Sequence, residues 1–407
     1  MSTQGRQMPP SLASQADSSR PLSQRTTFIL LTSILFTYVS ASAAPTPLYG
    51  LYREAWGFSP LMLTVAFAVY AFGLLTSLLI VGSLSDHVGR RPVVLAAMMV
   101  EALSLVLFLS AQDIGGLILA RVVQGVATGA ATTALGAALL DVDRAKGSVV
   151  NSIAPMVGMA IGALGTSLLV QYAPLPMHLS YALLLVTLVL LGIAACFMPE
   201  TVSRRPGAWA SLRPNLRVAP HASQGMWKIM PLNASLWMTG GFFMSLGPSL
   251  ARSVTHIDTP VIGGLLVCAL TLSAGASILT LRNRDPRLSL NLSSVTMVTG
   301  IGITLAGVAL GQVPVLFGGT FLAGIGFGAG FLGAMRSIMP LAAPHERAGL
   351  LAVFYTLSYL AMSVPAMLAG LAASHVGLAN ATHGYGLIIM VLAGSAGIRS
   401  LRAHLAR

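Results

Sequence analysis

Long apolar runs recur along the whole chain, and they constrain its fold more than any other feature. A helix that crosses a bilayer needs about 20 predominantly apolar residues. Twelve runs have roughly this character, although the last, GYGLIIMVLAGSAGI, is short. They lie near residues 27–50, 60–84, 92–111, 114–140, 148–171, 178–198, 229–250, 260–281, 289–310, 313–337, 349–373 and 383–400. The pattern predicts an all-α polytopic membrane protein with 12 transmembrane helices.

The low charge content agrees with this prediction. Only 8% of the residues are charged and 55% are hydrophobic, whereas ordinary soluble domains carry about 25% charged residues. The net charge of +12 is compatible with a nucleic-acid partner. However, the basic residues lie in short turns between apolar runs rather than on one face. We therefore expect the lipid bilayer as the partner, and no nucleic acid.

The basic residues also predict an orientation. With the N-terminus in the cytoplasm, 20 of the 23 Lys and Arg residues fall on the cytoplasmic side, and Arg53 and Arg252 fall outside. Arg121 lies within a span. Such a bias follows the positive-inside rule. It predicts a multi-pass protein of the cytoplasmic (inner) membrane with both termini in the cytoplasm.

An internal repeat relates the two halves of the chain. A constant offset of 203 residues superposes Pro45 on Pro248 and Gly125 on Gly328. The same offset places the turn Asp143-Arg144-Ala145 on Glu346-Arg347-Ala348. Parallel repeats with a site between them near the bilayer midplane are the architecture of rocking secondary transporters. The sequence therefore predicts two six-helix pseudo-repeats.

The polar segments set the expected domain boundaries. The first residues are rich in Ser, Gln and Pro, which is typical of disorder, and no cleavable signal peptide is indicated. The longest polar connection separates spans 6 and 7. We expect a disordered cytoplasmic tail at 1–26, six-helix bundles at 27–200 and 229–407, and a cytoplasmic linker at 201–228.

The densest charge cluster is GSLSDHVGRRP, which begins at Gly82 between spans 2 and 3. It resembles the loop motif at this position in the major facilitator superfamily, G-x-L-(small)-D-(basic)-x-G-R-(basic). His87 departs from the usual Arg or Lys. RVVQGVATGA in span 4 is similar to a second family pattern through Arg121, Gln124 and Gly125, and PET at 199–201 to a third. The matching residues of the loop motif are Gly82, Leu84, Asp86, Gly89, Arg90 and Arg91.

The resemblance implies that Asp86 and Arg90 pair across the two halves when the cytoplasmic gate is shut. Asp86 would then lie at the N-terminus of span 11, where a carboxylate is favoured, and Arg90 would reach Asp141 or Asp143. The alternative is that Arg90 and Arg91 only fix topology and bind lipid phosphates.

Glu101 and Arg121 are the ionisable residues inside spans, and such residues by default mark function. One hypothesis makes Glu101 a proton carrier that Arg121 modulates. The alternatives are a static buried pair, or a Glu101 hydrogen-bonded to the backbone of span 2. The sequence leaves these alternatives open.

The family resemblance implies that spans 1, 4, 7 and 10 border the substrate cavity. Candidate lining residues, with two from span 11, are mostly aromatic and uncharged, which favours a lipophilic or neutral solute. These candidates are Tyr38, Gln124, Thr128, Trp237, Phe243, Phe327, Tyr355 and Tyr359.

The predicted function is secondary active transport of small solutes by alternating access, with proton-coupled efflux of lipophilic or drug-like compounds as the leading reading. Ala163 follows Gly162 where antiporters of the family often carry Gly-Pro, which weakens the indication for export. Alternatives are a metabolite uptake permease and, in another class, a polytopic membrane enzyme. We expect a monomer without enzymatic activity, with a small-molecule substrate and protons as partners, and neither cofactor nor metal.

Overall fold

The computed structural model describes residues 22–214, 216–256, 259–343 and 346–405, and its regular elements are helices throughout these ranges. The first eight helices are α1 Gln24–Ala43, α2 Pro45–Trp56, α3 Pro60–Val81, α4 Ser85–Val88, α5 Arg90–Ser110, α6 Ile114–Val142, α7 Arg144–Tyr172 and α8 Leu179–Ala195. The others are α9 Ala208–Ser211, α10 Pro220–Ser245, α11 Gly247–Thr255, α12 Pro260–Leu281, α13 Pro286–Leu310, α14 Val313–Ile338, a 3-10 turn Met339–Leu341, α15 Arg347–Val376 and α16 Leu378–Leu405.

The helices match the apolar runs of the sequence. Within the described residues, ten helical segments are long and apolar enough to cross a membrane, and α8 is a shorter apolar helix. All twelve predicted runs are largely helical, with α1 and α2 sharing the first run and α10 and α11 the seventh. The chain is therefore an integral, multi-pass membrane protein.

The first helix begins slightly earlier than the sequence predicts. It starts at Gln24 because the hydroxyl of Ser23 caps it, accepting the N–H of Thr26 at 3.2 Å. Most of the predicted tail, residues 1–21, lies outside the described residues.

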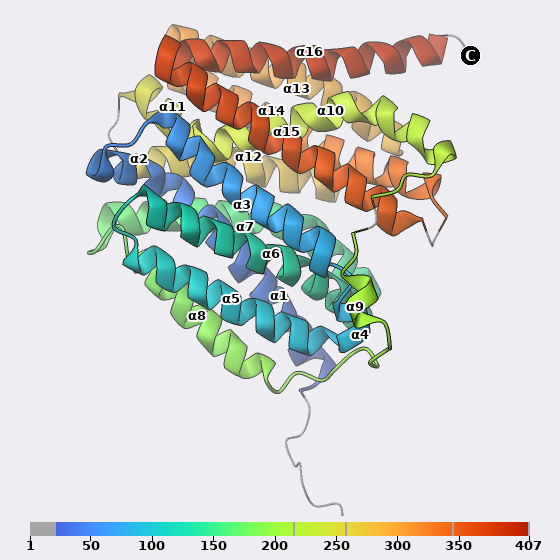
Figure 1. The fold of residues 1–407 in the computed structure, drawn as a ribbon. Helices are drawn as coiled ribbons and strands as arrows, with labels where there is room; N and C mark the ends of the chain where they lie inside the picture. Colours follow the sequence, from blue (N-terminus) through green and yellow to red (C-terminus); the bar gives the residue numbers. More distant parts are fainter. Residues whose placement is uncertain (1–21, 215, 257–258, 344–345, 406–407) are drawn as a thin grey trace, which may run out of the picture.

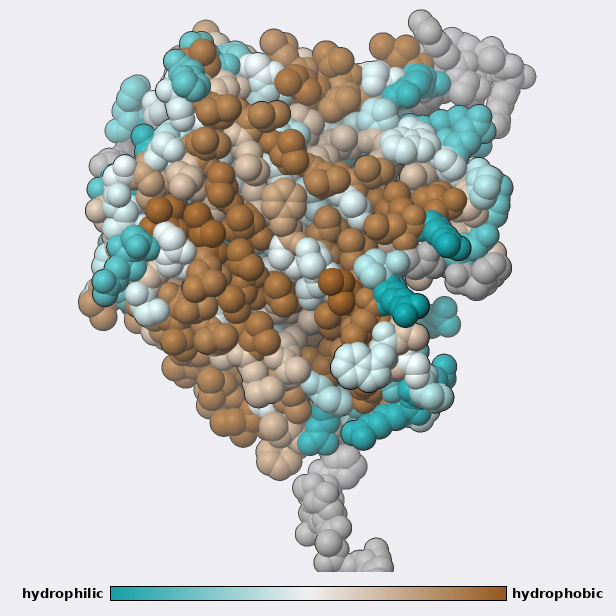
Figure 2. All heavy atoms as spheres, viewed as in Figure 1, coloured by the Kyte–Doolittle hydropathy of each residue, from teal (hydrophilic) through white to brown (hydrophobic). Residues whose placement is uncertain are grey.

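Figure 1 shows α1–α8, here called the first half, beside α10–α16, the second half. The halves contact each other where α3 packs along α15 and α7 along α12. One end of the molecule carries α4 and α9 (the α4 end), and the opposite end carries α2 and α11 (the α2 end). In Figure 2, the polar residues gather at these two ends and a broad apolar surface lies between them, as expected for a bilayer-spanning chain.

The internal repeat is visible in the helix breaks. The first span breaks at Ala44, directly before Pro45, and the seventh breaks at Leu246, two residues before Pro248. Proline fits the first turn of a helix, where its missing N–H is not needed. Equivalent prolines thus begin the short terminal helices α2 and α11.

Two equivalent glycines set the packing within each half. A Cβ atom on Gly125 of α6 would overlap with the carbonyl oxygen of Tyr70 in α3. A Cβ on Gly328 of α14 would likewise overlap with the carbonyl oxygen of Ala274 in α12. Small residues let membrane helices approach backbone to backbone. The 203-residue offset therefore corresponds to the same close helix contact in both halves.

Candidate functional site

A buried polar cluster lies inside the first half, between α1, α5 and α6. Gln124 of α6 donates one hydrogen bond to the Glu101 carboxyl, with 3.2 Å between Nε2 and Oε1. The same amide nitrogen donates to the carbonyl of Ala41 in α1 at 3.0 Å. Glu101 and Gln124 are fully buried. A buried carboxyl is costly unless it is hydrogen-bonded or neutral, so this position is a candidate for function.

Arg121 lies one turn before Gln124 on the same helix, and only 1% of its surface is exposed. Its guanidinium donates to Gln124 Oε1 at 2.6 Å and to the Ser42 carbonyl at 3.0 Å. The guanidinium carbon also lies 4.1 Å from the ring centroid of Tyr70 in α3, a cation–π geometry. Arg121 thus connects three helices of the first half.

The structure decides how Glu101 and Arg121 are related. They form no direct ion pair in the described structure, and Gln124 bridges them by accepting from Arg121 and donating to Glu101. Glu101 Oε2 has no hydrogen-bond partner among the described residues. Among the described residues, Glu101 makes neither a direct ion pair with Arg121 nor a hydrogen bond to the backbone of span 2, and the choice between a proton carrier and a static buried cluster stays a prediction. One carboxyl oxygen is held, and the other is available to a proton.

Arg90 organises a second cluster at the α4 end. Its guanidinium binds Asp141 Oδ2 at 3.1 Å and Ser85 Oγ at 2.7 Å, and it also forms an ion pair with Asp86. Thr201 donates to the same Asp141 oxygen at 3.1 Å. Of the two partners considered for Arg90 at the end of span 4, the structure has Asp141. Asp143 instead pairs with Lys146 at 3.1 Å.

Glu200 completes this cluster and was not singled out by sequence reasoning. Its carboxylate accepts the backbone N–H groups of Arg90 at 2.7 Å and Arg91 at 3.1 Å, so it caps the N-terminus of α5. Carboxylates are stabilised at this end of a helix. Gly89 makes the approach possible: its φ is 108°, and a Cβ there would overlap with Glu200. The signal was the PET segment, but its partner lies 110 positions earlier in the sequence.

The remaining residues of the loop motif lie around the same turn. Gly82 ends α3, Leu84 precedes α4, and Arg91 donates to the Cys196 carbonyl. Asp86 contacts Arg90 of its own half, and among the described residues it makes no hydrogen bond or ion pair with the start of α15. That contact stays a prediction for a state in which the α4 end is closed.

The cavity candidates of the second half form an aromatic group. Trp237 of α10 meets Tyr359 and Tyr355 of α15 edge to face, with ring centroids 4.8 and 6.4 Å apart. All three side chains are partly exposed, as is Phe327 of α14. Tyr355 and Tyr359 lie on α15, which packs along α3, the helix that carries Tyr70. This aromatic group therefore belongs to a helix at the interface of the halves.

Other cavity candidates are buried in this conformation. Tyr38, Thr128 and Phe243 have little or no exposed surface, like Gln124. Phe243 packs edge to face against Phe242, and Thr128 donates to the Gln124 carbonyl of its own helix. Their helices present these side chains to neighbouring helices, so a lining role for them stays a prediction.

An ion pair links the halves at the α2 end. Arg252 of α11 binds Glu54 of α2 at 3.2 Å. The guanidinium lies directly over Gly50, where a Cβ would overlap with it. This pair joins the two halves at the α2 end, whereas the Arg90 cluster of the α4 end is paired within the first half.

Comparison with known proteins identifies the family. The family model described as Major Facilitator Superfamily matches residues 28–298. The multidrug resistance protein MdtL of Citrobacter koseri is 26% identical over 297 residues, which cover 69% of this chain and 72% of the relative. MdtL of a Shewanella species (strain ANA-3) is 31% identical over 153 residues, 36% of this chain and 38% of the relative.

Solved structures share the fold at low identity. A mutant of the nucleoside transporter NupG has a TM-score of 0.74 at 12% identity, covering 91% of this chain and 98% of that one. The human organic anion transporter MFSD10 has a TM-score of 0.66 at 17% identity, covering 92% and 100%. The family match, the twelve apolar runs and the loop motif agree, and the chain belongs to the Major Facilitator Superfamily.

Proposed function

We propose that the protein is a secondary active transporter that exports lipophilic or drug-like compounds in exchange for protons. The observation that carries the proposal is the Glu101–Gln124–Arg121 cluster, because it holds a protonatable group in a buried hydrogen-bond network that reaches α3, a helix at the interface between the halves. An uncoupled channel or a scaffold has no need of a buried carboxyl with a free oxygen.

The proposed transport cycle uses the two halves as moving units, residues 27–200 and 229–407, joined by the linker at 201–228. The basic residues collect at the α4 end, so this end faces the cytoplasm of an inner-membrane protein. In this cycle, the Glu54–Arg252 pair closes the outer side and the α4 end opens toward the cytoplasm. Closing the α4 end would bring Asp86 to the start of α15.

Proton coupling follows from the geometry of the buried cluster. In the neutral form, the Glu101 carboxyl group would bind Gln124 through one oxygen and carry its proton on the other. When Glu101 releases its proton, the new charge is attracted by Arg121 through Gln124. Arg121 also contacts Tyr70 of α3, the helix that packs along α15 of the second half. A change in the protonation state of Glu101 would therefore alter interactions at the interface between the two halves, which must rearrange during transport.

The aromatic group suggests the substrate class. Trp237, Tyr355 and Tyr359 present partly exposed ring faces and edges without any carboxylate or ammonium beside them in the described structure. Such a surface binds apolar and aromatic solutes by area burial and ring stacking. The printed names of the MdtL relatives, multidrug resistance proteins, support export of compounds of this class.

The test is transport by purified protein in liposomes with an imposed pH gradient, scored with neutral, cationic and anionic aromatic dyes. We expect the wild-type protein to drive dye against its gradient only when protons flow the opposite way. Glu101→Gln should abolish the response to the gradient and retain exchange of dye down its gradient. Glu101→Asp, which keeps a carboxyl, is the matched control and should retain coupling.

The same experiment separates the alternatives. If solute and protons move in the same direction, the result would contradict export and support the alternative of a metabolite uptake permease. Equal responses of wild type and Glu101→Gln to the gradient would refute Glu101 as the proton carrier. Chemical conversion of a solute would favour the enzyme alternative, for which the described residues offer no group of three or more metal-binding side chains.

A further inference from the structure

We propose that the protein carries a specific site for one anionic phospholipid at the α4 end. One acyl chain lies in an apolar groove between α3 and α5, and the headgroup binds arginines of the linker. The proposal is independent of the transported substrate. It uses the proposed orientation only to assign the lipid to the cytoplasmic leaflet.

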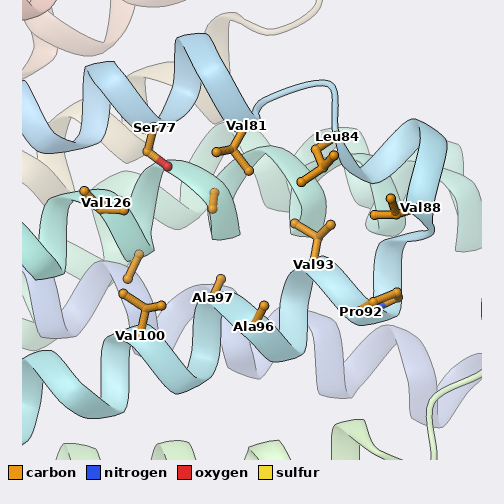
Figure 3. Close-up of a pocket in the computed structure, with 12 residues that line it drawn as sticks. Ser77, Val81, Leu84, Val88, Pro92, Val93, Ala96, Ala97, Val100 and Val126 are labelled. Carbon is orange, nitrogen blue, oxygen red and sulfur yellow. The ribbon is translucent and has the colours of Figure 1, made fainter. Parts of the chain in front are cut away.

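The groove is a cavity of about 330 Å³. Figure 3 shows Val81 of α3 and Val93, Ala96 and Val100 of α5 along its two sides. Val126 of α6 contributes to its floor. Apart from the Ser77 hydroxyl, the lining side chains are apolar, so the groove would bury methylene groups and has almost nothing to offer a polar ligand.

The short helix α4 connects this groove to the linker. Leu84 and Val88 line the end of the groove. On the same turn, the carbonyl of His87 accepts the backbone N–H of Arg205 at 2.8 Å. Ser83 donates its hydroxyl proton to the carbonyl of Ser211 at 3.0 Å. The linker is therefore fixed on the turn that closes the groove, as the position of α9 beside α4 in Figure 1 shows.

The linker has the charge that an anionic headgroup requires. Arg204, Arg205, Arg213 and Arg217 are all exposed, and no Asp or Glu occurs between Glu200 and Asp258. A basic residue at an anionic membrane surface contributes about 1 kcal/mol of attraction. Trp209 lies among them with 86% of its surface exposed, and tryptophan favours the membrane–water interface.

Together these features select a phospholipid rather than an acidic protein. An acidic segment would satisfy the arginines but would leave the groove empty. A neutral lipid would fill the groove but would leave the arginines without a counter-charge. An anionic phospholipid supplies the acyl chain and the phosphate in one molecule, at the spacing of a bilayer interface.

The experiment is native mass spectrometry of the full-length protein released from nanodiscs that contain equal amounts of phosphatidylglycerol and phosphatidylcholine. We expect one phosphatidylglycerol molecule to stay bound, at least about fivefold more often than phosphatidylcholine, since one arginine contact alone supports about this preference. Size-exclusion profiles and thermal unfolding show that each variant is folded.

Two variants with matched controls separate the headgroup from the groove. The triple variant Arg204→Gln, Arg205→Gln, Arg213→Gln should lose the headgroup preference. Arg282→Gln, Arg284→Gln, Arg287→Gln, which removes the same charge elsewhere at the α4 end, should not. Val126→Phe should fill the groove and lose retention. Val122→Phe, one turn away on α6 and equally exposed (37% against 39%), should retain it.

Each other outcome overturns the proposal. Equal retention of both lipids by the wild type would show an unselective groove. Retention that survives Val126→Phe but not the arginine changes would leave only a cationic surface. Loss of lipid in both control variants as well would show that no defined site exists.

Discussion

The two ends of the molecule use ion pairs in different ways. At the α4 end, the Arg90 side chain is buried and binds two carboxylates and a hydroxyl, all within the first half. At the α2 end, Arg252 makes a pair with Glu54, whose side chain is 65% exposed, and this pair joins the two halves. The contacts are chemically alike, but burial and connectivity differ.

The two ion-pair clusters differ in the free energy that is needed to break them. Breaking a buried ion pair that has several hydrogen bonds costs much free energy, because the remaining charge stays buried without a partner. Exposed pairs are worth roughly 0–1 kcal/mol, because water competes for both partners. The α4 cluster is therefore suited to hold a half rigid, and the α2 pair is suited to open and close.

Arg90→Gln should have the largest effect. It removes the charge-assisted bonds to Asp86 and Asp141, which are worth about 2 kcal/mol in total after allowance for partial hydration. We expect at least about a tenfold loss of transport rate and a lowered unfolding temperature. Arg91→Gln is the control: its side chain contacts only a backbone carbonyl in the described structure, so the rate should change little. Equal losses in both variants would contradict the special role of Arg90.

Gly50→Ala should have an intermediate effect at the opposite end. The added methyl group would occupy the place of the Arg252 guanidinium, so the guanidinium must move and we expect the cross-half pair to weaken. In a cysteine-free background, maleimide labelling of Ser249→Cys, a residue beside this pair, should rise by about three- to tenfold, as a shift of about 1 kcal/mol between states predicts.

Gly165→Ala is the control for this change, because nothing lies within 4 Å of a Cβ at that position. Its labelling should equal that of the parent. If Gly50→Ala also leaves labelling unchanged, the α2 end does not open through this contact.

Glu54→Gln should have the smallest effect. The exposed pair contributes at most about 1 kcal/mol, so the same labelling should rise by less than about fivefold. The difference from the parent should shrink at high salt, because ions screen exposed charges. A larger effect that is insensitive to salt would show that the pair is more desolvated than its exposure indicates.

The sequence predicts the spans well because hydropathy acts locally. Each apolar run must be helical in a bilayer, where unpaired backbone groups are not tolerated. Arg121 and Gln124 are three positions apart, so their shared helix face also follows from sequence. The loop motif likewise placed Arg90 near the end of span 4.

Contacts between distant segments were not predictable in this way. Glu200 reaches the start of α5 because α8 returns the chain to that end, which no local pattern encodes. The Tyr70 ring contacts Arg121 because Gly125 lets α6 pack closely against α3. The bridge through Gln124 depends on side-chain positions from three helices, so the sequence left the relation of Glu101 and Arg121 open.

The close glycine contacts have a mechanical consequence. Where α6 touches α3, and α14 touches α12, the backbones are in contact and no side chain lies between them to tilt or slide. We therefore expect each of these two helix pairs to move as a rigid unit. The two halves meet mainly where α3 packs along α15 and α7 along α12, so we expect their relative displacement to occur chiefly at these two contacts. The internal repeat therefore duplicates both the six-helix bundle and the close helix contact, at Gly125 and at Gly328, that keeps each bundle rigid.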